Sequence, residues 1–242
     1  MSKHGARISP RSSFFRTLYR LIFPLFLLSS LLLSACGGGS GSAPRLLEAF
    51  DDPTLSETGL PADSEGLPTL IADTATETAV VIETSFGEIQ LQMDSENAPN
   101  TVANFLEYVD AGHYDQTIFH RVIPGFMIQG GGFSPDFQRN ATRPPILNEA
   151  NNGLANDRYT IAMARTPLAH SATDQFFINV VDNPFLNHRA ETDADWGYAV
   201  FGRVTAGFDV VDQIVSVTTG AAGPFSIDSP VEPVIILSIS RD

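Results

Sequence analysis

The side chains most able to do chemistry here are five histidines, one cysteine and Arg121, which stands in the apolar segment 119–131. The histidines do not form the HExxH spacing of a zinc site. The glycines at 130–132 lack the GxGxxG pattern of a nucleotide site, and no GxSxG elbow indicates a hydrolase. An arginine stays charged at physiological pH and cannot act as a base. The chemistry open to Arg121 is therefore donation of hydrogen bonds.

Residues 119–131 read Phe-His-Arg-Val-Ile-Pro-Gly-Phe-Met-Ile-Gln-Gly-Gly, and this segment resembles the signature of the cyclophilin-type peptidyl-prolyl cis-trans isomerases. The resemblance continues through 153–164, 171–179 and 198–215, and it covers essentially all of residues 79–242. It implies a mainly β fold, a closed eight-stranded antiparallel barrel capped by two α-helices. It also implies a shallow proline-binding groove on the outer face and isomerisation of X-Pro peptide bonds.

The reaction sets a clear physical requirement. Rotation about an amide has a barrier of about 18–20 kcal/mol because the C–N bond has partial double-bond character. In the twisted state the proline nitrogen gains a free lone pair, so a fixed donor placed there favours the transition state over both ground states. The resemblance places Arg121 at the catalytic position. The predicted mechanism has no nucleophile, proton transfer, cofactor or metal.

The resemblance also assigns the substrate-binding positions. The pocket for the proline ring is expected from four apolar residues: Phe126, Met127, Phe177 and Leu186. Gln129 matches a polar groove position near the arginine. Gln175 and the backbone around 164–166, which includes Ala164 and Arg165, match positions that bind the main chain of the peptide.

Two positions depart from the best-known eukaryotic pattern. Phe185 stands where those proteins carry a tryptophan that donates to cyclosporin, so weakened drug binding with retained catalysis is expected. Tyr198 replaces a groove histidine, as in the bacterial branch of the family. The preceding loop carries Glu191, Asp193 and Asp195, whose field would favour basic substrates.

Each candidate residue also has a plainer interpretation. Apolar residues in strands are most often core, and a single arginine most often forms a surface ion pair. His120, beside Arg121, has no proton to move in this mechanism and is expected to be a hydrogen-bonded structural residue. At the level of function, the alternatives are a non-catalytic module that binds proline segments and a surface scaffold on a lipid anchor.

The pattern of residues predicts elements able to carry such a groove. Residues 79–84 and 88–93 are strand-like and flank a turn with a glycine, while 98–110 and 208–215 have helical spacing. Short apolar segments at 118–122, 126–129, 159–164, 175–181, 198–204 and 234–240 are typical of the strands of a barrel or a sandwich.

The N-terminus has the layout of an export signal. A basic, acid-free start precedes an apolar run at 21–33, which is short for a membrane span. Leu-Ser-Ala-Cys at 33–36 resembles the lipobox of bacterial lipoproteins, which implies a signal segment at 1–36 that ends at the lipobox cysteine, with cleavage just before Cys36 and acylation of Cys36. We expect a lipid anchor on the periplasmic face, in the outer membrane if the host is Gram-negative, because Gly37 is not an aspartate.

Residues 37–78 have the composition of a flexible acidic linker, followed by an isomerase domain at 79–242. After Cys36 the chain carries nine basic and 28 acidic residues, a formal charge of −19. That charge argues against nucleic acid as a partner. The expected partners are proline-containing segments of exported proteins, and the expected state is a tethered monomer.

Overall fold

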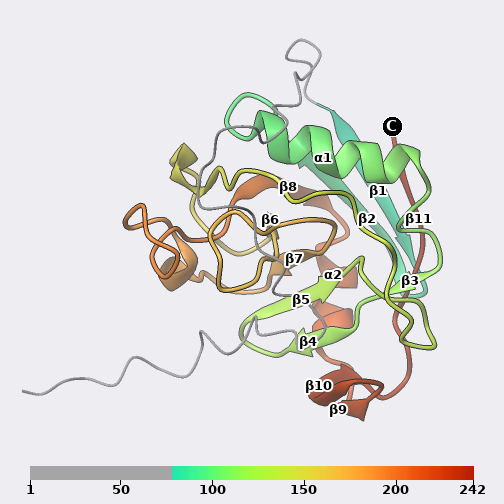
Figure 1. The fold of residues 1–242 in the computed structure, drawn as a ribbon. Coiled ribbons are helices and arrows are strands. Elements are labelled where there is room, and N and C mark those ends of the chain that lie inside the picture. The colour runs from blue at the N-terminus through green and yellow to red at the C-terminus, as the bar shows by residue number, and fades with distance from the viewer. Residues whose placement is uncertain (1–77) are drawn as a thin grey trace, which may run out of the picture. The chain divides into compact units, whose positions relative to one another are not determined.

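The computed structural model describes residues 78–242 (Figure 1). The expected signal peptide 1–36, with its lipidation site Cys36, lies outside the described residues, as do residues 37–77 of the expected linker. Within 78–242, no helix has both the length and the apolar character needed to cross a bilayer.

The first element is the predicted hairpin. Strands β1 (Ala79–Thr84) and β2 (Gly87–Met93) pair antiparallel, and Gly87 turns the chain at φ +131°, a conformation that favours glycine. Helix α1 (Pro99–Asp110) begins at a proline and buries the apolar face that the spacing predicts, with Val102 and Phe105 at its centre. Helix α2 (Phe208–Val215) has the predicted bounds.

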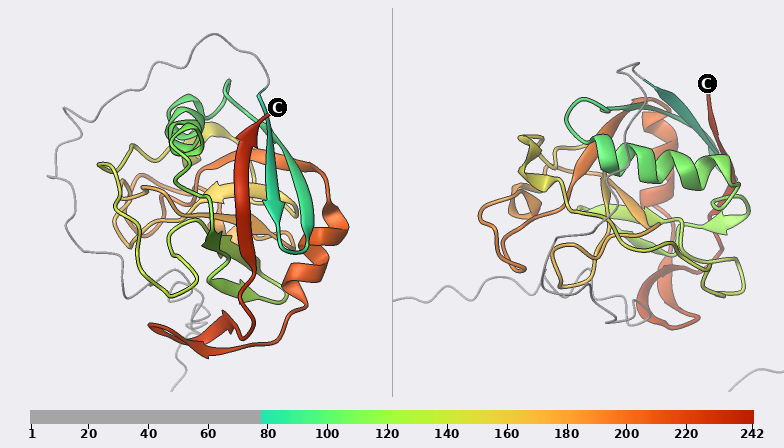
Figure 2. Two further views of the ribbon diagram at one scale, coloured as in Figure 1. Left: turned by 90° about the vertical axis from the view of Figure 1, so that its right-hand side faces the viewer. Right: turned by 45° about the horizontal axis from the view of Figure 1, so that its top comes forward.

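One antiparallel sheet carries most of the fold (Figures 1 and 2). Its other strands are β3 (Thr117–Ile118), β4 (Arg121–Ile123), β5 (Met127–Gly130), β6 (Thr160–Met163), β7 (Phe176–Asn179), β8 (Val200–Ala206) and β11 (Ile235–Arg241). Their order is β3-β11-β1-β2-β8-β6-β7-β5-β4. The sheet is a curled half-barrel of nine strands, so the expectation of a closed eight-stranded barrel is wrong.

The physical reason is a corner at Phe119 and His120. The segment expected as one strand over 118–122 divides there: β3 pairs with β11, and β4 pairs with β5 at the opposite edge of the sheet. Phe119 enters the main core and donates its N–H to the carbonyl of Val234 at 2.9 Å. The polypeptide therefore connects the two edge strands, β3 and β4, through Phe119 and His120. In the described part of the chain, no ladder of backbone hydrogen bonds pairs these two strands.

A second, two-stranded sheet was not predicted. Strands β9 (Thr219–Ala222) and β10 (Phe225–Pro230) form a hairpin of mostly small residues without apolar alternation. Two short 3-10 helices, η2 (Ala150–Asn152) and η3 (Pro184–Leu186), lie in the loops.

The two faces of the large sheet bury two different clusters. In β7, Phe176 and Ile178 enter the main core with residues of α1 and α2, whereas Phe177, between them, belongs to a second apolar cluster. The same alternation places Met127 in the second cluster and Ile128 in the first. The outer face of the sheet therefore has its own apolar surface, separate from the core.

Candidate active site

The register of the strands places five residues in one row across the outer face. Arg121 is directly opposite Gln129, and Gln129 is opposite Phe177. Phe177 in turn is opposite Ala162, which is opposite Val200. Because directly paired residues share a face of the sheet, the row runs from a cation through an amide to an apolar floor.

The apolar part of this surface holds all four of the expected pocket residues. Its buried members are Phe126, Met127, Ala162, Ala164, Phe177, Leu186, Tyr198 and Val200. The ring of Phe126 stacks on Phe185 at a centroid distance of 5.7 Å, and Phe185 is 41% exposed at the edge of the cluster. Phe177 meets the ring of Tyr198 edge-on at 5.8 Å. These residues form a buried cluster separate from the main core, and their role as the proline pocket stays a prediction.

Two glutamines form the polar part of the surface. The side-chain amide of Gln129 donates to the side-chain oxygen of Gln175 at 2.8 Å, and both residues are 1% exposed. Among the described residues, the Gln129 side-chain oxygen is buried without a hydrogen-bond partner. A buried acceptor in this state is unfavourable unless a ligand or water donates to it. It is therefore a candidate acceptor for an N–H of the substrate.

The main chain at 164–166 is less open to substrate than expected. The N–H of Ala164 donates to the carbonyl of Gln175 at 2.9 Å, and the N–H of Thr166 donates to the hydroxyl of Ser171 at 3.0 Å. These two donors are already used within the fold. The expected binding of a peptide main chain at this segment would therefore need other groups than these two N–H donors.

The side chain of Arg165 has a structural task. Its guanidinium donates to the carbonyls of Gly197 at 2.9 Å, Thr166 at 3.0 Å and Asp193 at 3.0 Å. It also lies over the ring of Tyr198 at 4.7 Å. Burial lowers the pKa of Arg165, an effect that the nearby Tyr198 and Asp193 oppose. Arg165 thus holds two loops against the apolar cluster and does not enter the groove.

The acidic loop before Tyr198 is largely engaged in contacts of its own. The carboxylate of Asp193 accepts from the N–H of Ala169 at 2.8 Å, and Asp195 pairs with Arg189 at 2.5 Å. Glu191 and Asp193, both exposed, make no ion pair within the described part of the chain. Two of the three carboxylates are therefore not neutralised by a cation, and the bias towards basic substrates stays a prediction.

Two aromatic side chains close to the groove have fixed roles. The indole N–H of Trp196 donates to the carbonyl of Asn148 at 3.0 Å, so it cannot supply the donor that Phe185 lacks. His120 is fully buried, stacks on Phe225 at 5.2 Å and meets Phe133 at 4.8 Å. These ring contacts agree with a structural role for His120, and its expected hydrogen bonds stay a prediction.

Sequence reasoning missed a buried chain of asparagines behind the pocket. Asn183 donates to the side-chain oxygen of Asn179 at 2.7 Å, and Asn179 donates to that of Asn156 at 3.3 Å. All three are at most 2% exposed. Their amides also donate to the carbonyls of three pocket residues: Phe126, Leu186 and Tyr198. The only signal in the sequence is the frequency of asparagine in the loops at 151–187, which also fits ordinary turns.

We predict that Asn183→Ala lowers the free energy of unfolding by about 1–3 kcal/mol, because it leaves buried acceptors without a donor. The carbonyl of Phe126 keeps one bond, from the N–H of Val180 at 3.1 Å, so the pocket loosens without collapsing. We therefore also expect a higher KM for a proline peptide. Asn151→Ala, at an exposed position, is the matched control. A loss of stability with an unchanged KM would show that the buried asparagines support the fold and do not contribute to peptide binding.

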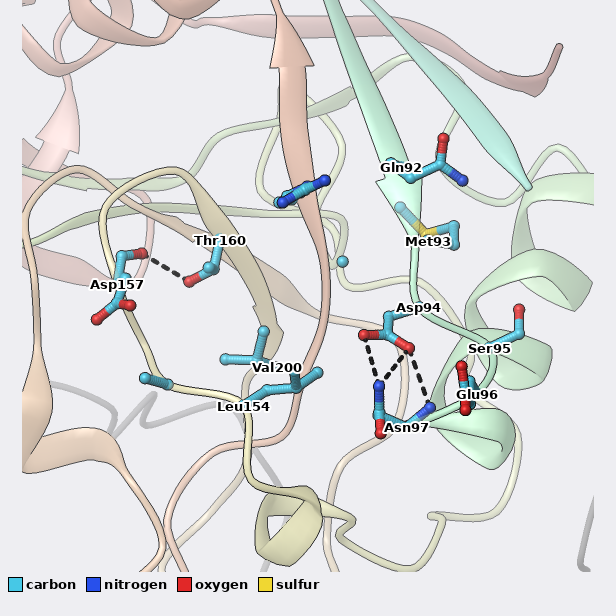
Figure 3. Close-up of a pocket in the computed structure, with 13 residues that line it drawn as sticks. Gln92, Met93, Asp94, Ser95, Glu96, Asn97, Leu154, Asp157, Thr160 and Val200 are labelled. Carbon is cyan, nitrogen blue, oxygen red and sulfur yellow. Dashed lines mark hydrogen bonds between the residues drawn. The ribbon is translucent and has the colours of Figure 1, made fainter. Parts of the chain in front are cut away.

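A cavity of about 460 Å³ lies beside this surface (Figure 3). It is formed by the end of β2 with residues 94–97, by the loop that includes Leu154 and Asp157, and by β8. It shares Val200 with the apolar cluster but contains none of the predicted site residues. Within 78–242, no group of three or more His, Cys, Asp or Glu side chains is placed to hold a metal ion.

Comparison with known proteins agrees with this geometry. Residues 79–241 match the model of the family described as cyclophilin type peptidyl-prolyl cis-trans isomerase/CLD. The chain is 62% identical over 159 residues to peptidyl-prolyl cis-trans isomerase cyp18 of Streptomyces antibioticus, covering 66% of this chain and 95% of that protein. It is 56% identical over 161 residues to peptidyl-prolyl cis-trans isomerase B of Escherichia coli, covering 66% and 98%.

Solved structures show the same fold. A cyclophilin type peptidyl-prolyl cis-trans isomerase of Cryptosporidium parvum has a TM-score of 0.56 and 26% identity, covering 68% of this chain and 97% of that one. A structure of the same protein in the presence of the dipeptide Ala-Pro has a TM-score of 0.55. The chain therefore belongs to the cyclophilin-type peptidyl-prolyl cis-trans isomerase family, and the function expected from the resemblance is confirmed at this level.

Proposed function

We propose that this chain accelerates rotation about X-Pro bonds with Arg121 as the catalytic residue. The observation that carries the proposal is the outer-face row, in which Arg121 and Gln129 stand next to the apolar floor at Phe177. A proline ring held on that floor would present its nitrogen towards the guanidinium. The charge stabilises the lone pair that forms on the nitrogen only while the amide is twisted.

The remaining residues bind and orient the peptide. Phe126, Met127, Phe177 and Leu186 hold the proline ring, and burial of apolar surface supplies the affinity. Phe185 and Tyr198 border the cluster. The free side-chain oxygen of Gln129 accepts from the main chain of the peptide, while Gln175 fixes the orientation of Gln129. Ala164 lines the cluster and Arg165 supports it from behind.

The alternative is a module that binds proline segments without catalysis. Exchange between the cis and trans forms of an Ala-Pro peptide, measured by NMR with catalytic amounts of the full chain, separates the two. Faster exchange than in buffer supports the enzyme. Binding of the peptide with an unchanged exchange rate would leave the binding module as the function.

We further propose that the protein is a bacterial lipoprotein that assists folding of exported proteins as a tethered monomer. The support is the sequence alone: the basic start, the short apolar run and the lipobox ending at Cys36. Two or more acyl chains would anchor the protein stably, since one chain is marginal. In a bacterial host, labelled fatty acid should be incorporated into the parent and not into Cys36→Ser, and only the parent should sediment with membranes. Equal labelling of both would refute the anchor.

A further inference from the structure

The hairpin β9–β10 is anchored directly beside the catalytic strand, below β4 in the view of Figure 1. Phe225, directly after the turn of the hairpin, is 8% exposed, stacks on His120 at 5.2 Å and meets Phe133 edge-on at 5.3 Å. The N–H of Val231 donates to the carbonyl of Thr218 at 2.9 Å and closes the hairpin. His120 immediately precedes Arg121, so the hairpin is fixed relative to the start of β4.

The backbone of β10 is irregular at Asp228. The pairing with β9 shifts register between Phe225 and Ser229, and Asp228 has φ +65°. That left-handed conformation is unfavourable for a residue other than glycine, although aspartate tolerates it better than most. Bulges of this kind change the direction in which a side chain points. Residues with a strained backbone are concentrated at functional sites.

The carboxylate of Asp228 lies next to the guanidinium of Arg121. Oδ2 of Asp228 is 3.9 Å from Nη2 of Arg121, and the two side chains are 26% and 16% exposed. This separation is too long for a hydrogen bond but short enough for an ion pair in a partly shielded place. The carboxylate therefore attracts the guanidinium without accepting a hydrogen bond from it.

We infer that Asp228 is a positioning residue, which restrains the guanidinium of Arg121 towards the groove through its charge. Arginine has several rotatable bonds, and a donor stabilises a transition state well only when its position is set beforehand. Asp228 acts through Arg121 and does not touch the substrate. The inference rests on the catalytic role proposed for Arg121.

The first test is Asp228→Asn in the full chain, which keeps the size of the side chain and removes the charge. We expect kcat for an Ala-Pro peptide to fall about three- to fivefold, the scale of a partly exposed ion pair, with KM and the unfolding temperature unchanged. Asp228→Glu should restore at least half of the loss. Glu232→Gln, an exposed change nearby, is the control for the general field. An unchanged or higher kcat in Asp228→Asn would overturn the inference.

The second test separates positioning from other effects with a double-mutant cycle. In an Arg121→Ala background, measured at high enzyme concentration, Asp228→Asn should change the rate no further. If the same loss persists without Arg121, Asp228 acts on something else and the inference fails. If Arg121→Ala alone keeps the parent rate, the catalytic role of Arg121 is what fails.

Discussion

Replacement of Arg121 by alanine will lower kcat/KM for an Ala-Pro peptide by about 100- to 1,000-fold, the usual effect of removing one preorganised donor from a transition state. The effect should fall mainly on kcat, because the donor meets a lone pair that exists only in the twisted amide. The fold should be little affected, since Arg121 lies on the outer face and makes its ion pair at 3.9 Å. Exchange NMR gives the rate, and denaturant unfolding gives the stability.

Two further variants make this result specific. Arg121→Lys keeps the charge but loses the planar set of donors, so an intermediate rate is expected. Arg241→Ala removes an exposed arginine at the end of β11, paired with Asp110 at the end of α1, and should leave the rate unchanged. A normal rate in Arg121→Ala would place catalysis elsewhere on the surface.

The largest effect on stability is predicted for Phe176→Ala, with a loss of about 3–5 kcal/mol in the free energy of unfolding. Phe176 is fully buried and meets the rings of Phe105 at 5.7 Å, Tyr114 at 5.5 Å and Phe119 at 6.1 Å, all nearly perpendicular. Its removal leaves a cavity at the centre of the main core, between α1 and the sheet. Denaturant unfolding of parent and variant measures the loss.

The next residue along the strand offers a matched comparison. Phe177 is also fully buried but lies in the outer cluster, so Phe177→Ala should both lower stability and raise KM for the peptide, whereas Phe176→Ala should leave KM of the folded enzyme unchanged. Phe208→Ala, at a residue that is 40% exposed, should change stability far less than Phe176→Ala. If Phe177→Ala lowered stability and left KM unchanged, the outer cluster would not be the proline pocket.

Much of the fold could be predicted from local pattern. The hairpin at 79–93 and the helices at 99–110 and 208–215 follow from period, a turn glycine and an N-terminal proline, which act over a few residues. The resemblance in 119–131 then indicated the site. Alternation along β7 accounts for the opposite faces of Phe176 and Phe177.

The remaining features depend on contacts between distant segments. The break at Phe119 and His120, which leaves the sheet open, is set by the pairing of β3 with β11, far along the chain, while β4 pairs locally with β5. The β9–β10 hairpin has little apolar pattern, and Phe225 is its one member in the apolar cluster with Ile118 and Phe133. Asparagine at 156, 179 and 183 is ambiguous in sequence, because only the fold brings the three amides together.

Arg165 shows a different limit of prediction from sequence. The resemblance matched its position to main-chain binding, and nothing local reveals that its guanidinium folds back to donate to five carbonyls. An arginine beside a groove could equally point into it. The side chain is buried here because loops at 166–168 and 193–197 supply enough acceptors to compensate for its desolvation.

The central claim is catalysis by a fixed positive charge without proton transfer, and the pH dependence of kcat/KM tests it most directly. Between pH 6.5 and 9, Arg121 stays charged. Burial lowers the pKa of His170 below its usual 6.5 and raises the pKa of Tyr108 and Tyr114 above their usual 10. Exchange NMR on an Ala-Pro peptide should give a kcat/KM constant within about twofold. A tenfold change that follows one titration would show that a proton moves in the reaction and would contradict the mechanism.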